Sequence, residues 1–170
     1  MKTETTKKLE ELLASHFNIR NDFFVFECTI GWYGNEIVDC INYNCQREVL
    51  CFEIKQSVSD FRSKNKLTFI GNRNYFVMPL SLYEKVKNEI PDEIGVYVAC
   101  KRIRVEEEEK IGLGKRTVVY LKPIEGFDEL FCIKKCKQRR LTADKEIILS
   151  SMLRCACRDR ARKSMFATGD

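Results

Sequence analysis

The fold of this chain depends on two short apolar runs, Glu36-Ile37-Val38-Asp39-Cys40-Ile41-Asn42 and Glu48-Val49-Leu50-Cys51-Phe52-Glu53-Ile54-Lys55. Both runs are rich in β-branched and aromatic residues, and the segment between them is polar, so they predict a pair of adjacent strands. Because side chains alternate between the two faces of a strand, Glu53 and Lys55 share one face and Phe52 lies on the other.

Charged side chains inside such strands are costly unless they face solvent, a partner or a ligand. A pairing that brings Asp39 beside Glu53 would direct carboxylate oxygens at one point, which suits Mg²⁺ or Mn²⁺. Lys55 would then orient a water or stabilise developing phosphate charge. The alternative is an ordinary solvated sheet face with weak cross-strand ion pairs. The spacing alone leaves both interpretations open.

Length and composition indicate a single globular domain, or one domain with a tail. The chain has 170 residues, of which 44% are hydrophobic and 32% charged, as in soluble proteins. The sequence has no apolar stretch long enough to span a bilayer, and the start, Met1-Lys2-Thr3-Glu4, has no apolar signal region. We therefore expect a cytoplasmic protein without a membrane partner. Its nine cysteines should be reduced there, and their odd number argues against a disulfide framework.

Periodicity and turn residues predict further elements around the strand pair. The chain begins with an amphipathic helix and a strand, and alternates helix and strand after the pair. This order, helix, three strands, helix, strand, helix, strand, predicts an α/β domain with a mixed sheet. The expected elements are a helix over Thr3–His16, a strand over Phe23–Ile30, a helix over Ser57–Leu67, a strand over Asn74–Met78, a helix over Ser81–Glu89 and a strand over Gly95–Cys100.

The rest of the chain is expected to be less regular. Residues 102–106 and Thr117–Leu121 predict a hairpin across a charged loop, with Glu106–Glu109 solvated in that loop. Pro123–Asp128 has the composition of a linker. Thr142–Phe166 has helical periodicity, which places Ile148, Met152, Cys155 and Asp159 along one stripe. We therefore divide the chain into a domain over residues 1–122 and a segment over 123–170, the linker and a basic helix, packed on the same domain.

Positive charge gathers near the C-terminus. Residues 132–170 contain 11 Lys and Arg against 4 Asp and Glu, a net charge of +7, whereas the whole chain carries +5. A near-neutral body with a basic segment indicates a polyanion partner, most simply nucleic acid. A solvated basic helix without a specific role explains the same composition.

The order of elements, with Asp on the second strand and Glu-x-Lys on the third, resembles the PD-(D/E)xK nuclease fold. The stretch Phe52-Glu53-Ile54-Lys55-Gln56-Ser57-Val58-Ser59-Asp60-Phe61-Arg62 is similar to the Glu-x-Lys-x-Ser…Asp-Phe stretch of the MmcB-like branch, which is associated with DNA repair. Asn74-Tyr75-Phe76-Val77-Met78-Pro79 and residues 90–98 resemble the next two strands of that branch. The resemblance covers roughly residues 5–122, and Val38 stands where the named motif has Pro.

This resemblance implies a restriction-endonuclease-like mixed sheet flanked by helices and metal-dependent hydrolysis of DNA phosphodiesters, in DNA repair or mobile-element defence. It implies that Asp39 and Glu53 hold Mg²⁺ or Mn²⁺ and that Lys55 assists the attacking water. A glutamate on the first helix often completes such a site, and Glu10 or Glu11 would take that place. Catalytic loss on this fold would leave a DNA-binding or partner-binding module, and a protein-interaction scaffold without a nucleic-acid role is a third class.

Phosphate contacts are expected beside the metal site and along the basic segment. Gln56 and Ser57 follow the Glu-x-Lys directly, and lysines continue along the next predicted helix. DNA is the expected partner, and a homodimer or a repair-protein partner is compatible with the resemblance. The expected nucleic-acid contacts are Gln56, Ser57, Lys64, Lys66, Lys134, Lys135, Lys137, Arg139, Arg140, Arg154 and Arg158.

Four C-terminal cysteines have the right number for a structural zinc or an iron–sulfur cluster, which some nucleases of this fold carry. They are Cys132, Cys136, Cys155 and Cys157. Their spacing includes no C-x-x-C, and Cys155 and Cys157 would point about 200° apart in a regular helix. We therefore expect neither zinc nor a cluster at these thiols.

Overall fold

The two apolar runs form adjacent antiparallel strands, β2 (Ile37–Tyr43) and β3 (Val49–Ile54). The structure is a computed structural model, which describes residues 2–20, 22–32, 34, 36–63, 68–111 and 114–166; side chains at positions 20, 110, 111, 114 and 161–166 are not among those described. The tight connection from β2 to β3 includes Asn44, whose side-chain oxygen accepts hydrogen bonds from the backbone amides of Gln46 and Glu48. This local polar chemistry fixes the register that the strand pair needs.

The described strands form one mixed seven-stranded sheet, so the fold class is α/β. Strands β3 and β5 each pair in parallel with β4, and the other pairs are antiparallel. The remaining strands are β1 (Phe23–Thr29), β4 (Arg73–Pro79), β5 (Gly95–Ile111), β6 (Gly114–Glu125) and β7 (Glu129–Lys134), in the spatial order β1-β2-β3-β4-β5-β6 with β7 also against β5.

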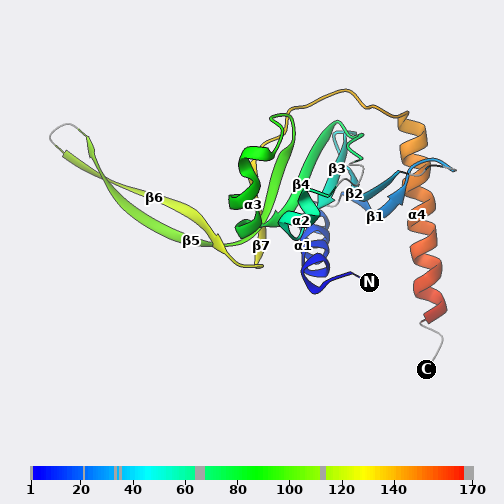
Figure 1. Cartoon of the computed structure of the whole chain (residues 1–170), viewed down its shortest axis with the longest axis horizontal. Helices are drawn as coiled ribbons and strands as arrows, with labels where there is room; N and C mark the ends of the chain where they lie inside the picture. Colours follow the sequence, from blue (N-terminus) through cyan, green and yellow to red (C-terminus); the bar gives the residue numbers. More distant parts are fainter. Residues whose placement is uncertain are drawn as a thin grey trace.

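Helices cover both faces of the sheet (Figure 1). On one face, α1 (Glu4–Arg20) buries Leu9, Leu13 and Phe17 against the central strands. On the other face, α4 covers the β1–β3 side, while two short helices cover the β4–β5 side. The bounds of the second group are α2 (Val58–Phe61), α3 (Leu80–Val86) with a 3₁₀ turn at Lys87–Glu89, and α4 (Lys145–Phe166). None of the helices in the described part of the chain is both long and apolar enough to cross a membrane.

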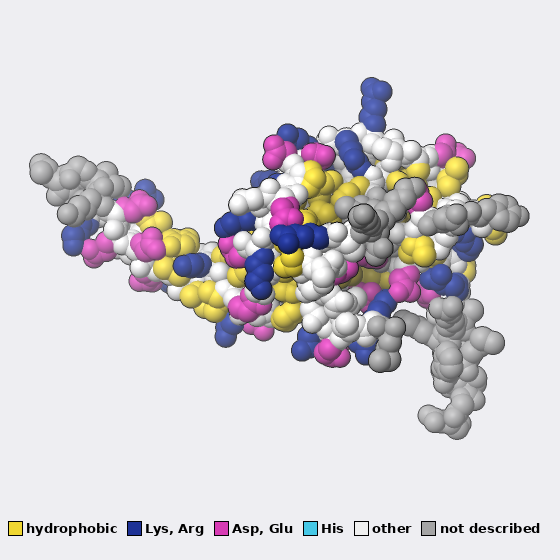
Figure 2. Space-filling model, viewed as in Figure 1, with side chains coloured by type: hydrophobic (Ala, Val, Ile, Leu, Met, Phe, Trp, Pro, Cys, Tyr) yellow, Lys and Arg dark blue, Asp and Glu magenta, His cyan; other side chains and the backbone are white. Residues whose placement is uncertain are grey.

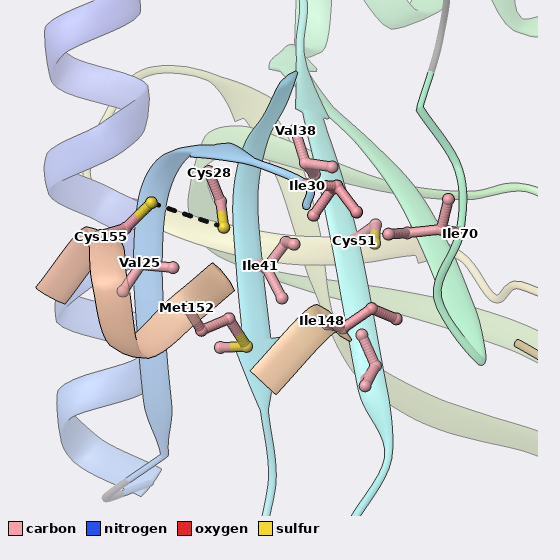
Figure 3. Packing of buried hydrophobic residues seen from close by; sticks show 11 residues of the cluster. Val25, Cys28, Ile30, Val38, Ile41, Cys51, Ile70, Ile148, Met152 and Cys155 are labelled. Atoms are coloured by element: carbon pink, nitrogen blue, oxygen red, sulfur yellow. Dashed lines mark hydrogen bonds between the residues drawn. The ribbon is translucent and has the colours of Figure 1, made fainter. Parts of the chain in front are cut away.

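Helix α4 contributes a buried stripe to the second face (Figure 3). Ile148, Met152 and Cys155 recur at helical spacing and are at most 2% exposed. They pack on Val25 of β1 and Ile41 of β2, among other residues of that cluster. The sequence predicts this stripe, and the basic C-terminal segment is therefore part of the same hydrophobic core.

The largest difference from the expected elements is a long arm made of β5 and β6, which extends away from the rest of the sheet (Figure 1). The expected solvated loop at Glu106–Glu109 is instead strand, paired with residues 116–119. Basic residues make this pairing possible, since Arg116 lies opposite Glu109 and Lys115 bonds Glu108 at 2.8 Å. Strand β6 also continues through Pro123, where a linker is expected; proline is tolerated there because β6 is an edge strand.

The helix expected over residues 57–67 is shorter in the structure. Its α-helical part ends at Phe61, and the amide of Ser63 bonds the carbonyl of Asp60 in a closing turn. Ser57 caps the start of the helix, its side-chain oxygen accepting from the amide of Asp60 at 3.2 Å. Residues 64–67 lie outside the described part of the chain.

Candidate metal and phosphodiester site

Strands β2 and β3 separate just beyond the pair Cys40–Phe52, and the next residues in that register are Asp39 and Glu53. Val38 packs beneath α4 whereas Cys40 packs on the α1 side, although residues two apart in a regular strand face the same side of the sheet. The alternation of side chains along β2 is therefore interrupted at Asp39. On the neighbouring strand β1, the φ angle of Glu27 is +48°, an irregularity at the same level of the sheet. The carboxylate of Asp39 accepts a hydrogen bond from the amide of Ile54 at 2.8 Å, across the opening.

The separated strand ends open into a cavity of about 590 Å³. It contains the three residues of the strand-pair motif together with the predicted Glu10 and Gln56. Its lining residues are Lys2, Thr6, Glu10, Glu27, Glu36, Ile37, Asp39, Glu53, Ile54, Lys55, Gln56, Asp60 and Thr68. Side chains from α1, β1, β2 and β3 and the start of α2 thus converge on one space.

Glu53 is the most constrained carboxylate of this cavity. It is 5% exposed, and its Oε1 atom has no hydrogen-bond partner. Burial and the negative charge of Asp39 raise the pKa of Glu53 to about 8, while Lys55 and the backbone of Thr68 act in the opposite direction. Burial also raises the pKa of Asp39, against the effect of the Ile54 amide. The carboxylates of Asp39 and Glu53 therefore have too little positive charge around them to offset the cost of burying both in their charged forms.

Lys55 is equally buried, at 5% exposure, although it carries an ammonium group. Its amide bonds the carbonyl of Val77 on β4 at 2.9 Å, which continues the line of β3 beyond its last paired residue. The Nζ atom lies 3.9 Å from a carboxylate oxygen of Asp60. Asp60 is held in turn by the amide of Gln56, 3.0 Å from its other oxygen. The sequence pattern predicts no role for Asp60. The feature that points to it is its position five residues after Lys55, in the first turn of a helix that Ser57 caps.

Lys2 occupies the α1 side of the cavity. Its Nζ atom lies 2.7 Å from Glu10 and 2.9 Å from Glu27. Glu10 therefore lines the cavity as expected for a third ligand, with its carboxylate already paired to a cation. Lys2, Glu27 and Glu36 are cavity residues that the sequence analysis missed, because their approach depends on contacts between distant segments.

The two residues after Lys55 have different positions. Gln56 lines the cavity, and its side-chain oxygen accepts from the hydroxyl groups of Thr3 and of Thr6, the latter at 3.4 Å. Ser57 is not among the lining residues and serves as the α2 cap. The predicted contacts Lys64 and Lys66 lie outside the described residues.

Several of the predicted basic contacts are engaged within the protein. Lys134 donates to the carbonyls of Ile90 and Pro91 at 3.1 and 2.7 Å, at the end of the 3₁₀ turn. Arg154 donates to two carbonyls, those of Thr29 at 2.8 Å and Gly31 at 2.7 Å. These side chains hold segments of the fold together.

Of the other basic contacts, two are partly buried and three are exposed. Arg158 pairs with Asp159 at 3.1 Å, and the Arg139 side chain reaches the carbonyl of Gly71 at 3.4 Å, with one nitrogen buried and without a partner. Lys135, Lys137 and Arg140 are exposed on the segment between β7 and α4. These last three are the basic side chains best placed to meet a polyanion.

The four C-terminal cysteines do not converge. Cys132 and Cys136 pack in the cluster on the α1 face, whereas Cys155 is buried beneath α4 on the opposite face. The Sγ atom of Cys155 lies 3.7 Å from that of Cys28 on β1 (Figure 3). Cys157 is exposed. The sheet therefore separates the two pairs, and one ion cannot bind all four thiols.

The residues of the cavity fit a hard divalent cation. A buried carboxylate oxygen without a partner, next to a second carboxylate, is the arrangement that such an ion would neutralise. Within the described residues, no group of three or more His, Cys, Asp or Glu side chains has ligand geometry. Magnesium commonly binds one or two carboxylates and keeps several waters, so Asp39 and Glu53 are a sufficient protein contribution.

Comparisons with known proteins bear on the fold alone. No family model matches the chain, and no curated protein matches it. A solved structure of a protein from Silicibacter pomeroyi, described as the SPO1766 protein of unknown function, is similar over 99% of this chain and 94% of that chain, with a TM-score of 0.65 and 12% sequence identity. The chain thus shares the fold of that protein.

Proposed function

We propose that this protein is a metal-dependent phosphodiesterase of the PD-(D/E)xK kind that acts on DNA. The observation that carries the proposal is the buried, unpartnered Oε1 atom of Glu53, in one cavity with Asp39 and Lys55. An oxygen in that state costs free energy unless a ligand compensates it. A surface ion-pair cluster, the alternative for these residues, would leave the three side chains solvated.

The arrangement of elements supports a restriction-endonuclease-like fold. The chain order α1-β1-β2-β3-α2-β4-α3-β5 agrees with the order that the sequence predicts. Asp39 and Glu53 lie where adjacent strands part, so their side chains and nearby amides face a space rather than a ladder. Fold alone does not establish an activity, so the proposal rests on the side chains of the cavity.

Mg²⁺ or Mn²⁺ would be held by Asp39 and Glu53, with Glu10 as a further ligand once Lys2 releases it. When bound, such an ion lowers the pKa of a water and offsets phosphate charge. Lys55 donates from its ammonium group to the attacking water or to a phosphate oxygen, and Asp60 limits where that ammonium can point. Gln56 lies at the same opening and offers its side-chain amide to the substrate backbone.

The exposed residues Lys135, Lys137 and Arg140 would supply phosphate contacts that do not depend on base sequence. Contacts of this kind position a nucleic acid and make its binding dependent on salt. They fit a protein that acts on DNA in the cytoplasm, in repair or in defence against mobile elements, and they specify neither partner nor substrate sequence.

The test combines metal binding with cleavage. Purified protein is titrated calorimetrically with Mn²⁺ and incubated with end-labelled single-stranded and duplex DNA in Mg²⁺ or Mn²⁺. We expect Glu53→Gln to abolish both Mn²⁺ binding and DNA cleavage. Lys55→Met should retain Mn²⁺ binding while cleavage falls about 100-fold or more, which is what one catalytic group contributes. Glu11, the other candidate on α1, is exposed and is not among the residues that line the cavity, so Glu11→Gln is the matched control and should change neither.

A second candidate is a DNA-binding or partner-binding module that does not cleave. Lys2 favours it, because its ammonium bonds Glu10 and Glu27 and so supplies part of the positive charge that a metal would bring. Salt-sensitive DNA binding without Mn²⁺ binding or cleavage would establish the DNA-binding module and refute the phosphodiesterase. Absence of DNA affinity at low salt would refute both of these and leave a module that binds a protein partner.

A further inference from the structure

The arm formed by β5 and β6 leaves one edge of β5 open. Strand β4 pairs with β5 only as far as Pro79, which lies opposite Ala99. From Cys100 to Ile111, the described partner of β5 is β6, on the other edge. The arm extends from the body in Figure 1, so among the described residues no strand lies beside the backbone groups of β5 that point away from β6 over most of its length.

A two-stranded ribbon of this length is an unusual element to leave in solution, because isolated ribbons are marginally stable and open edges attract other strands. Large apolar side chains are exposed along it: Ile103 at 38%, Val119 at 48%, Tyr120 at 38% and Leu121 at 53%. Figure 2 shows hydrophobic side chains among acidic and basic ones along the arm. Exposed apolar groups next to a free edge indicate a surface that a partner covers.

The sequence of the open edge is self-complementary. It reads Lys101-Arg102-Ile103-Arg104-Val105-Glu106-Glu107-Glu108-Glu109, so three cations precede Val105 and four acids follow it. If a second copy pairs antiparallel with a two-fold axis at Val105, a residue before Val105 lies opposite the residue that is equally far after Val105 in the other copy. Arg104 then meets Glu106, Arg102 meets Glu108, and Lys101 meets Glu109, each twice, while Ile103 lies opposite Glu107. Residues directly opposite share a face, so these pairs are in reach of one another.

We propose that two copies of this chain associate through antiparallel pairing of their β5 edges, with the two-fold axis at Val105. The interface is isologous, as expected for a symmetric dimer. It joins the two arms into one four-stranded ribbon and places the two Val105 side chains against each other. The proposal rests on the arm alone and does not depend on the phosphodiesterase.

The other edge of the arm is not suited to the same pairing. On β6, an axis at Val119 would place Arg116 opposite Lys122, a repulsive pair on both sides. Pro123 lacks a backbone amide, which interrupts hydrogen bonding along that edge. Like charges and proline are the devices by which proteins protect edges from pairing. The two edges of one ribbon thus differ, and β5 is the one that accepts a second copy.

The charges of Arg104 and Glu106 on the β5 edge are available for exchange. Arg104 pairs with Glu106 of its own strand at 2.9 Å, with side chains 68% and 56% exposed. Exposed pairs of this kind contribute little, so replacing the partner by its equivalent from the second copy has a small cost. Arg102 is bound to Glu129 through two nitrogens, so it contributes less to the association than Arg104 does.

An interface made of one strand from each copy is small, so the dimer should be weak and dependent on salt. Sedimentation velocity over a range of protein concentrations at low salt should show a reversible monomer–dimer equilibrium. Raising NaCl to about 0.5 M should shift it toward monomer, because screening acts on exposed pairs.

Charge reversal then tests the register. Arg104→Glu and Glu106→Arg each replace two attractive pairs by two repulsive ones and should weaken self-association roughly tenfold or more. Mixing the two variants should restore association, because each then meets its opposite charge in the other chain. The double variant R104E/E106R should self-associate like the original. Lys122→Glu, an equal change of charge on β6, is the control and should leave the equilibrium unchanged.

All of these variants change exposed side chains, and circular dichroism checks that each of them remains folded. A protein that is monomeric at low salt up to millimolar concentration would overturn the proposal. So would a dimer that both single variants leave intact, or one that mixing fails to restore.

Discussion

The carboxylate of Asp39 accepts a hydrogen bond from the backbone amide of Ile54, 2.8 Å away, at the point where β2 and β3 part. The bond gives a partner to an amide that does not pair with the backbone of β2, because the two strands have separated there. It also fixes the direction of a carboxylate next to Glu53. Asp39 therefore has two tasks, one in the sheet and one in the cavity.

Substitutions at Asp39 should separate these tasks. Asp39→Asn keeps an oxygen for the Ile54 amide but removes the charge, so we expect near-normal stability and loss of Mn²⁺ binding. Asp39→Ala removes both and should lower the free energy of unfolding by about 1–3 kcal/mol, because a buried amide is left without a partner. Urea denaturation and calorimetric titration measure the two effects. Equal stability of the two variants would show that the hydrogen bond has no structural role.

The buried carboxyl of Glu53 predicts an unusual pH dependence of stability in the metal-free protein. Its pKa is about 8 in the folded state, above its usual value of 4.5. Between these values the folded state binds more protons than the unfolded state, so stability is highest at the acid end and falls as pH rises through 8. The raised pKa of Asp39 acts in the same direction.

Glu53→Gln removes the largest of these effects. We expect its thermal midpoint, relative to that of the original protein, to rise between pH 5 and pH 9 in the presence of a chelator. Mn²⁺ should reverse the order at pH 8 by stabilising the original protein alone. A difference between the two proteins that does not vary with pH would contradict the raised pKa of Glu53.

Two arginines of the basic segment should differ in what their loss affects. Arg154 donates to the carbonyls of Thr29 and Gly31, and its guanidinium lies 5.0 Å from the ring of Trp32. Arg154→Met should therefore destabilise the protein by about 1–3 kcal/mol. The slope of DNA affinity against salt concentration should stay the same.

Arg140 is exposed, so Arg140→Gln should leave stability unchanged and reduce the salt slope of DNA binding by about 1, the loss of one phosphate contact. Thermal denaturation and fluorescence anisotropy at several salt concentrations provide the comparison. If Arg154→Met reduced the slope instead, Arg154 would be a DNA contact.

Adjacent residues of α4 give a matched test of its packing. Met152 is fully buried beneath the helix, whereas Leu153 is 62% exposed. Met152→Ala should destabilise by about 2–5 kcal/mol through the cavity that it leaves. Leu153→Ala should stay within about 0.5 kcal/mol, since it removes few contacts. Similar losses in chemical denaturation would mean that α4 does not pack as described.

The sequence predicts those parts of the fold that depend on local pattern. Alternation along β3 places Glu53 and Lys55 on one face, and helical spacing finds the stripe of Ile148, Met152 and Cys155. The hairpin between residues 102–106 and Thr117–Leu121 is predicted, but its length is missed, because four consecutive glutamates resemble a solvated loop. Arg116 and Lys115 come to Glu109 and Glu108 only through the register with β6. Strand β7 is missed as well, because it follows directly on Pro123–Asp128, whose composition is that of a linker.

Side-chain partners that come from distant segments are the least predictable part of the site. The position of Lys2 beside Glu10 and Glu27 depends on how α1 lies over the sheet, which no local pattern specifies. The role of Arg154 has the same origin, because its charge suggests a nucleic-acid contact while its neighbours are the carbonyls at the end of β1.

The position of α4 in the core also has a consequence during synthesis. The apolar face of β1, β2 and β3 is closed by Ile148, Met152 and Cys155, which are translated roughly a hundred residues after β3. At ordinary elongation rates this is an interval of about 5–20 seconds. Over that interval the emerging chain presents Val25, Ile41 and their neighbours uncovered to the cell, a target for chaperones that the finished protein no longer offers.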